Sequence, residues 1–126
     1  MRKMSDLVRN QRPLVLPPTA TVMEAARRMR EFRFGATLVA DHNKRLVGIF
    51  TGRDAVDRVL AEGRDPTATT LAEVMTRDPH TLMPQHNAIE ALRLMQDLRC
   101  RHLPIVQEGS LLGIVSHGDF QLNIST

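Results

Sequence analysis

The chain repeats itself over most of its length, and this internal repeat restricts its fold more than any other feature. Eight residues between positions 13 and 33 recur as identical residues 66 positions later, between 79 and 99. One residue fewer in the following loop changes the offset to 65, and the string GIFTGRD at 48–54 returns as GIVSHGD at 113–119. An in-register match of this length predicts that two homologous halves build the fold.

Each half is predicted to follow the order strand, helix, strand, strand, helix. The segments LVLPP and HTLMP have short extended patterns that end at proline, and each precedes a helical pattern. GATLVA and HLPIV have the composition of buried strands, and polar loops connect them to RLVGIF and LLGIV as hairpins. We therefore expect an α/β (α+β) protein of two β-α-β-β-α repeats, residues 1–66 and 67–126, that pack with pseudo-twofold symmetry.

The first helix of each half begins with a capping signal. Thr21 precedes Glu24, and Asn87 precedes Glu90, with the spacing of an N-cap residue and its N3 partner. The second helix of the first half is predicted from about 53 to 62 with Gly63 at its end, whereas FQLNIST leaves room for a short helix only. Apolar residues at intervals of three and four are expected in the core: Val22, Ala25, Ala26 and Met29, then Ala88, Ala91, Leu92, Met95 and Leu98.

Composition argues against several classes of function. The pI is about 10.0, but the net charge is only +3, and the chain has no Trp, no Tyr and four Phe on which bases could stack. Small anionic ligands fit this balance better than nucleic acid. No apolar run approaches the roughly 18 residues of a membrane span, and a single cysteine, Cys100, cannot form an internal disulfide. We expect a cytoplasmic protein that does not associate with membranes.

The repeated motif, Gly-apolar-apolar-[Thr/Ser]-x-x-Asp, contains residue types that suit a nucleotide. Its glycine permits close approach of backbone or ligand, and Thr51 or Ser116 lies where a strand passes into a helix whose N–H groups attract phosphate. Asp54 or Asp119 would repel phosphate but can accept hydrogen bonds from both hydroxyls of a ribose. The same spacing fits a capping box that needs no ligand. Both interpretations stay open, and one residue pair can serve both.

Arg101 and His102 are further candidates, because they enter a strand that is expected to end beside the motif. A phosphate contact is one interpretation; a solvated arginine and a satisfied strand histidine are the alternatives. The first half has Gly35 and Ala36 at these positions. The two halves are therefore expected to differ in affinity, although the sequence does not say which aspartate lies near Arg101.

Catalysis and metal binding are not expected. Cys100 and His102 are predicted on the same face of a strand, but no third group is evident that would orient a thiolate nucleophile. The five histidines lack a metal-ligand spacing. Val56, Val59 and Leu60 are expected to leave an apolar helix surface for a second copy of the chain.

The doubled helix-and-proline pattern, with RHLPIV before a hairpin and the Thr/Ser-x-x-Asp motif after it, resembles the cystathionine-β-synthase-like (CBS) domain pair, or Bateman module, over roughly residues 4–122. The resemblance implies a non-catalytic regulatory module that binds an adenosyl ligand in clefts between the repeats, often as a homodimer. Candidate ligands are AMP, ADP, ATP, S-adenosylmethionine and NAD, with no cofactor required. The alternatives are a ligand-independent dimerisation module and a regulatory fragment of a larger enzyme or transporter. The residues expected to contact the ligand are Thr51, Arg53, Asp54, Arg101, His102, Ser116 and Asp119.

Overall fold

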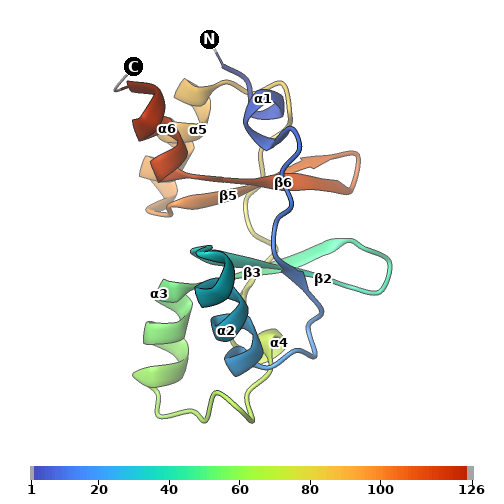
Figure 1. Cartoon of the computed structure of the whole chain (residues 1–126), viewed down its shortest axis with the longest axis vertical. Coiled ribbons are helices and arrows are strands. Elements are labelled where there is room, and N and C mark those ends of the chain that lie inside the picture. The colour runs from blue at the N-terminus through green and yellow to red at the C-terminus, as the bar shows by residue number, and fades with distance from the viewer. Residues whose placement is uncertain (1, 125–126) are drawn as a thin grey trace. The chain divides into compact units, whose positions relative to one another are not determined.

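The chain folds into two compact units (Figure 1). A computed structural model describes residues 2–124, and the surroundings of side chains up to residue 120. One unit is the continuous stretch Pro13–Pro79, and the described part of the other consists of residues 2–12 and 80–124. The repeats predicted at 1–66 and 67–126 describe which parts of the sequence are homologous to each other. The compact units have other limits, because a segment from outside its own repeat packs on each sheet: residues 71–77 on the first and residues 2–12 on the second.

The unit at 13–79 contains a four-stranded sheet in the order β1-β2-β3-β4. β1 runs parallel to β2, and the other neighbours are antiparallel. The predicted order of strand, helix, strand, strand, helix is confirmed, and a short helix and strand follow it. The elements are β1 (Val15–Leu16), α2 (Val22–Phe32), β2 (Ala36–Ala40), β3 (Leu46–Thr51), α3 (Gly52–Asp54), the π-helical η1 (Ala55–Leu60), α4 (Leu71–Val74) and β4 (Thr76–Arg77).

The ends of α2 follow from local signals in the sequence. The Thr21 hydroxyl accepts the backbone N–H of Glu24 at 3.1 Å, as the capping pattern predicts. Arg33 ends the helix in the left-handed conformation, with a φ of 59°. Ala25 is fully buried, but Ala26 is exposed, so the expected core stripe is wrong at this residue. Successive helical residues are about 100° apart around the axis, and only one of the two faces the sheet.

The second helix of this unit runs through α3 and η1 and ends before Gly63, whose φ of 70° is the left-handed conformation that glycine tolerates. Val56 and Leu60 leave 55% and 67% of their surface exposed, as predicted. Val59 is 1% exposed and belongs to the core, so the expectation that it lies on the free surface is wrong. It is the residue of this turn that faces the sheet.

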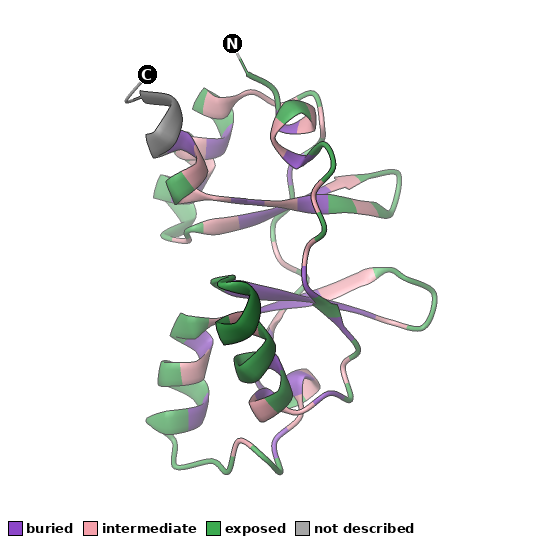
Figure 2. Cartoon of the chain, in the orientation of Figure 1, coloured by how far each residue is buried: buried purple, intermediate pink, exposed green. Residues whose placement is uncertain are grey.

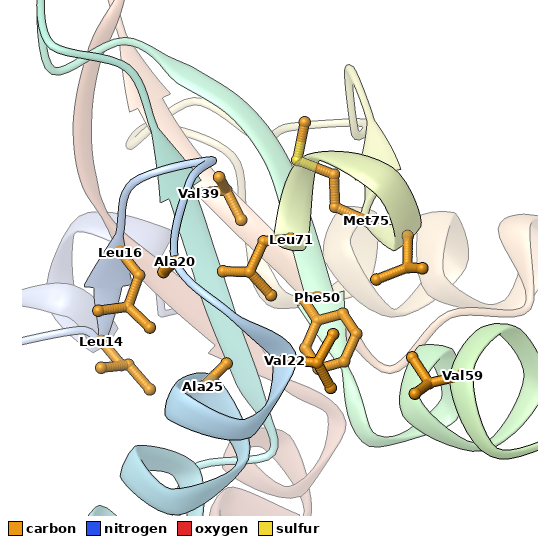
Figure 3. Close-up of a cluster of buried hydrophobic side chains, with 11 residues drawn as sticks. Leu14, Leu16, Ala20, Val22, Ala25, Val39, Phe50, Val59, Leu71 and Met75 are labelled. Carbon is orange, nitrogen blue, oxygen red and sulfur yellow. The ribbon is translucent and has the colours of Figure 1, made fainter. Parts of the chain in front are cut away.

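Apolar side chains from the sheet and from every longer helix form the core of this unit (Figure 3). They are Leu14, Leu16, Ala20, Val22, Ala25, Val39, Phe50, Val59, Leu71, Val74 and Met75. Figure 3 shows Leu71 and Met75 among strand residues such as Val39 and Phe50. Leu71 is 0% exposed, and burying a leucine side chain contributes about 2 kcal/mol. This burial explains why the unit extends beyond the repeated sequence.

The other unit contains a two-stranded antiparallel sheet, which α1, α5 and α6 accompany (Figure 1). The strand predicted at HTLMP is reduced to a bridge between Leu82 and Ile105. Pro84, two residues after Leu82, lacks the N–H that a longer ladder needs. The elements are α1 (Met4–Val8), α5 (Ala88–Leu98), β5 (His102–Gln107), β6 (Ser110–Ser116) and α6 (His117–Ile124).

The capping box predicted for α5 is complete. The Asn87 side chain accepts the N–H of Glu90 at 2.9 Å, and the Glu90 carboxylate accepts the N–H of Asn87 at 3.3 Å. Arg99 ends the helix with a φ of 55°. Met95 is buried as expected, whereas Leu98, at the last turn, is 37% exposed. Figure 2 shows that buried, intermediate and exposed residues occur along the chain of both units.

Two glycines of the repeated motif allow a neighbouring segment to lie against the middle of a strand. A Cβ added at Gly48 would lie 2.8 Å from Met75 Cγ, and one at Gly113 would lie 2.9 Å from Val8 Cβ. Both distances are shorter than carbon atoms tolerate. The close approach that the sequence predicted is therefore made by Met75, directly after α4, and by Val8 of α1, and these glycines are needed for the core.

Candidate ligand-binding motifs

The first motif follows β3 and forms a capping box at the start of α3. The Asp54 carboxylate accepts the Thr51 N–H at 2.9 Å and the Thr51 hydroxyl at 3.2 Å. The same hydroxyl oxygen accepts the Asp54 N–H at 3.3 Å. The capping interpretation is thus confirmed for this pair.

Asp54 also holds more distant parts of its unit. Its second carboxylate oxygen accepts the Thr76 hydroxyl of β4 at 3.3 Å and lies 3.7 Å from Arg58 Nε. Arg58 in turn donates to the carbonyl of Met75 at 2.9 Å. Asp54 is only 8% exposed, so its carboxylate is a buried junction between β3, η1 and β4. A carboxylate accepts about four hydrogen bonds. Thr51 and Thr76 donate three to Asp54, and Arg58 adds a positive charge at ion-pair distance.

Arg53 lies beside this motif but takes no part in the capping box. Its guanidinium Nε lies 3.6 Å from an Asp57 carboxylate oxygen, and both side chains are mostly exposed. Such an exposed pair one helical turn apart contributes little to stability. Thr51, Arg53 and Asp54 are therefore together in one unit, with the arginine in a surface ion pair.

The second motif is in the other unit, where β6 passes into α6. The Asp119 carboxylate accepts the Ser116 N–H at 2.7 Å. The equivalent bond in the first motif is the one from the Thr51 N–H to Asp54. Ser116 and Asp119 are both half-buried. Asp119 is therefore more exposed as a residue than Asp54, which is buried.

Arg101 and His102 lie next to this second motif. His102 pairs with Ser116 across the β5–β6 ladder, and the His117 N–H donates to the Arg101 carbonyl at 2.8 Å. In the first unit, the corresponding pair is Ala36 with Thr51. The strand register thus places Arg101 and His102 in the same unit as Ser116 and Asp119.

Burial and charge determine the protonation of two side chains here. Burial lowers the pKa of His102, the Arg101 charge lowers it further, and Asp119 opposes both effects. At neutral pH the imidazole is therefore neutral, and Arg101 is the cation of the group. Burial raises the pKa of the Cys100 thiol, which disfavours a thiolate. Cys100 precedes β5, so the prediction that it shares a strand face with His102 is wrong.

Several residues that contact the motifs were not predicted from the sequence. Arg58 is four residues after Asp54, a spacing that could have indicated an ion pair. Thr76 and Gln11 act through tertiary contacts that leave no local signal. Among residues 2–124, no group of three or more His, Cys, Asp and Glu side chains could hold a metal ion. Over the same residues, no helix is long and apolar enough to cross a membrane.

Two repeats of strand, helix and hairpin, each followed by a Thr/Ser-x-x-Asp motif, define a tandem-repeat module of the α/β class. The family model described as "CBS domain" matches residues 4–61 and again residues 71–125. This chain belongs to the CBS domain family, as a tandem CBS pair, or Bateman module.

Individual proteins agree with this assignment. The chain is 38% identical over 108 residues to the CBS domain-containing protein CBSCBSPB3 of Arabidopsis thaliana, covering 86% of this chain but only 19% of that protein. The crystal structure of the CBS domain NE2398 superposes with a TM-score of 0.91 at 25% identity and covers 99% of this chain and 98% of its own. The CBS domain protein PAE2072 of Pyrobaculum aerophilum has a TM-score of 0.85 at 24% identity and covers 98% of each chain.

Proposed function

We propose that this CBS pair is a non-catalytic regulatory module that binds an adenine nucleotide or a related adenosyl compound. The observation that supports it best is the group of Arg101, His102, Ser116 and Asp119 at the junction of β6 and α6. A guanidinium, a hydroxyl and a carboxylate at the start of a helix match the parts of a nucleotide.

Each group has a distinct partner on such a ligand. Arg101 is exposed and carries the positive charge that a phosphate needs. The Ser116 hydroxyl and the first N–H groups of α6 add neutral donors to the same anion. Asp119 is expected to accept the ribose hydroxyls, as a carboxylate pairs with a diol.

The choice of ligand depends on these residues. PAE2072 is complexed with AMP, but a likeness at 24% identity supports the fold alone. AMP, ADP, ATP, S-adenosylmethionine and NAD therefore all stay candidates. The proposed setting is the cytoplasm.

Thermal unfolding with and without each ligand tests the proposal. A ligand selective for the native state raises the melting temperature, because it stabilises by about 2.7 kcal/mol at a hundredfold excess over its Kd. Arg101→Ala should weaken AMP binding by roughly ten- to a hundredfold and adenosine binding far less, because only AMP has the phosphate. Arg93→Ala, which removes an exposed arginine of α5, is the matched control. No shift with any of the five at millimolar concentration contradicts the proposal.

The second candidate function is a dimerisation module that binds no ligand. The complete capping box of Thr51 and Asp54 favours it, because that motif has a structural use of its own. A homodimer is compatible with both functions. We propose that its contact includes the exposed Val56 and Leu60 of η1, whose apolar surface a second copy would cover.

A further inference from the structure

The exposed side of α2 combines arginines without internal partners and an aromatic pair. We propose that it is a docking surface for an acidic segment of a partner protein that also carries apolar side chains. The residues of this surface, which we call the α2 surface, are Arg27, Arg28, Arg30, Phe32, Arg33 and Phe34. It lies within the unit at 13–79 and does not depend on nucleotide binding.

The four arginines of the α2 surface have no use inside the unit. All four are exposed, and within residues 2–124 no ion pair or hydrogen bond engages any of their side chains. Arg53, Arg58 and Arg64 of the same unit each have a carboxylate partner. Arg27 and Arg30 are three residues apart, a spacing at which like charges weaken a helix slightly. Arginines that repel one another and stabilise nothing internal favour an anionic partner from outside.

Two phenylalanines at the end of α2 add an apolar part to the surface. Phe32 and Phe34 are 48% and 40% exposed, and their ring centroids lie 6.1 Å apart in a stacked pair. The Phe34 N–H donates to the Met29 carbonyl at 2.9 Å, directly after Arg33 in its left-handed conformation. The backbone therefore holds Phe34 beside the helix end, and the exposed pair is available to cover a partner's apolar side chain.

The equivalent helix of the other repeat shows that the fold does not require these side chains. α5 ends in the same way, with Arg99 left-handed and the Cys100 N–H donating to the Met95 carbonyl at 3.1 Å. At the positions equivalent to Arg28, Arg30, Phe32 and Phe34, α5 and its end carry Leu94, Gln96, Leu98 and Cys100. The same backbone is thus formed without the arginines and the aromatic pair, which supports a role for them outside folding.

The charges beside the arginines favour a polypeptide over a polyanion. Glu24 and Glu31 lie on the same helix, and together with Arg27, Arg28 and Thr67 they line a hollow of about 410 Å³. Nucleic-acid phosphates and anionic lipid headgroups carry one sign of charge only, so these carboxylates would repel them. A polypeptide can instead place acidic residues at the arginines, a basic residue at the glutamates and an apolar residue on the phenylalanines.

Selection from a library of random peptides displayed on phage, with the full chain as bait, tests the α2 surface. We expect the selected peptides to be rich in Asp and Glu and to contain Leu or an aromatic residue. A synthetic peptide of the most frequent sequence should lose at least about tenfold in affinity for Arg28→Glu/Arg30→Glu, because attraction becomes repulsion. Selected peptides without acidic enrichment, or equal affinity for wild type and this double variant, would overturn the proposal.

Three single variants complete this measurement. Arg28→Ala, which introduces no new charge, should weaken the peptide less than the double variant does, and Phe34→Ser should weaken it through the lost apolar contact. Arg93→Glu is the matched control, since it changes an exposed arginine of α5, and should leave the Kd within about twofold of wild type. Circular dichroism checks that every variant is folded. A loss in Arg93→Glu as large as in the double variant would overturn the assignment to α2.

The other possible occupants of the α2 surface are tested with the same proteins. A thymidine oligonucleotide, and vesicles of phosphatidylcholine with phosphatidylserine, should both bind more weakly than the selected peptide at the same salt concentration. Tighter binding of either, lost in Arg28→Glu/Arg30→Glu, would replace the polypeptide by a polyanion and overturn the proposal. Sedimentation velocity should show the same self-association for wild type and the double variant. Loss of a dimer in the double variant would show that a second copy of the chain covers this surface, which would also overturn it.

Discussion

Gly48 and Gly113 show how a single missing side chain shapes each unit. Both lie in the middle of a strand at the point where another segment crosses it, and their neighbours are Met75 and Val8. Neither neighbour is near in sequence, so the repeated glycine could be recognised as important without its reason being known. The physical reason is contact between side chain and backbone in the core.

The glycine at 113 gives a direct test. Gly113→Ala should lower the free energy of unfolding by about 1–3 kcal/mol, because the new methyl group would overlap Val8 Cβ, and the helix that carries Val8 must move. Gly52→Ala is the matched control, since no atom lies within 4 Å of a Cβ at that position. Urea unfolding of both variants measures the difference. Equal stabilities would contradict the importance of the approach at Gly113.

At the level of whole elements, the unpaired edge of β6 is covered by a side chain in place of a strand. Gln11, just after α1, both donates to and accepts from the backbone of Ile114. In the other unit, the corresponding Ile49 faces Thr76 of β4. An amide side chain thus satisfies the backbone groups that a strand satisfies in the other unit.

Removing this amide should loosen one edge of the sheet. Gln11→Ala is expected to cost about 1–3 kcal/mol, because it leaves a part-buried N–H and carbonyl of Ile114 without their partner. Amide hydrogen exchange at Ile114 should become faster at the same time. Gln96→Ala, which removes an exposed glutamine of α5, should change neither quantity. Unchanged exchange at Ile114 in the Gln11 variant would show that the edge does not depend on this side chain.

The elements that the sequence predicted correctly are those with local signals. Thr21, Asn87 and Gly63 define helix ends through bonds or backbone conformations within a few residues. The short elements α1, α4 and β4 were missed, because burial against a distant strand stabilises them and their own sequences do not. For the site, the residue types were predictable from the repeat. The register that pairs His102 with Ser116, and the junction from Asp54 to Thr76, arise only on folding.

At the scale of the whole molecule, the chain contributes to its two units alternately. It starts in one, builds the other from Pro13 to Pro79, and then returns to the first. Val8 against Gly113 and Met75 against Gly48 are equivalent contacts, so each unit takes its covering segment from the first part of the other repeat. Repeat and folding unit therefore differ, and neither repeat alone contains a complete core.

The oligomeric state of the whole molecule depends on whether the exposed apolar surface of η1 contacts a second copy of the chain. Val56 and Leu60 are 55% and 67% exposed and four residues apart, which makes them the natural centre of a contact with a second copy. Wild type should therefore be a dimer at high micromolar concentration. Leu60→Glu should raise the dimer dissociation constant at least tenfold, because a carboxylate would be buried in an apolar contact.

Ile89→Glu is the matched control for this prediction, since Ile89 is 49% exposed but belongs to α5 of the other unit. Sedimentation velocity over a concentration series measures the association of all three proteins, and circular dichroism checks that the variants are folded. A monomeric wild type at high micromolar concentration would contradict the dimer. Dissociation by Ile89→Glu with Leu60→Glu unaffected would place the contact on the other unit, because a glutamate weakens association only where its desolvation accompanies binding.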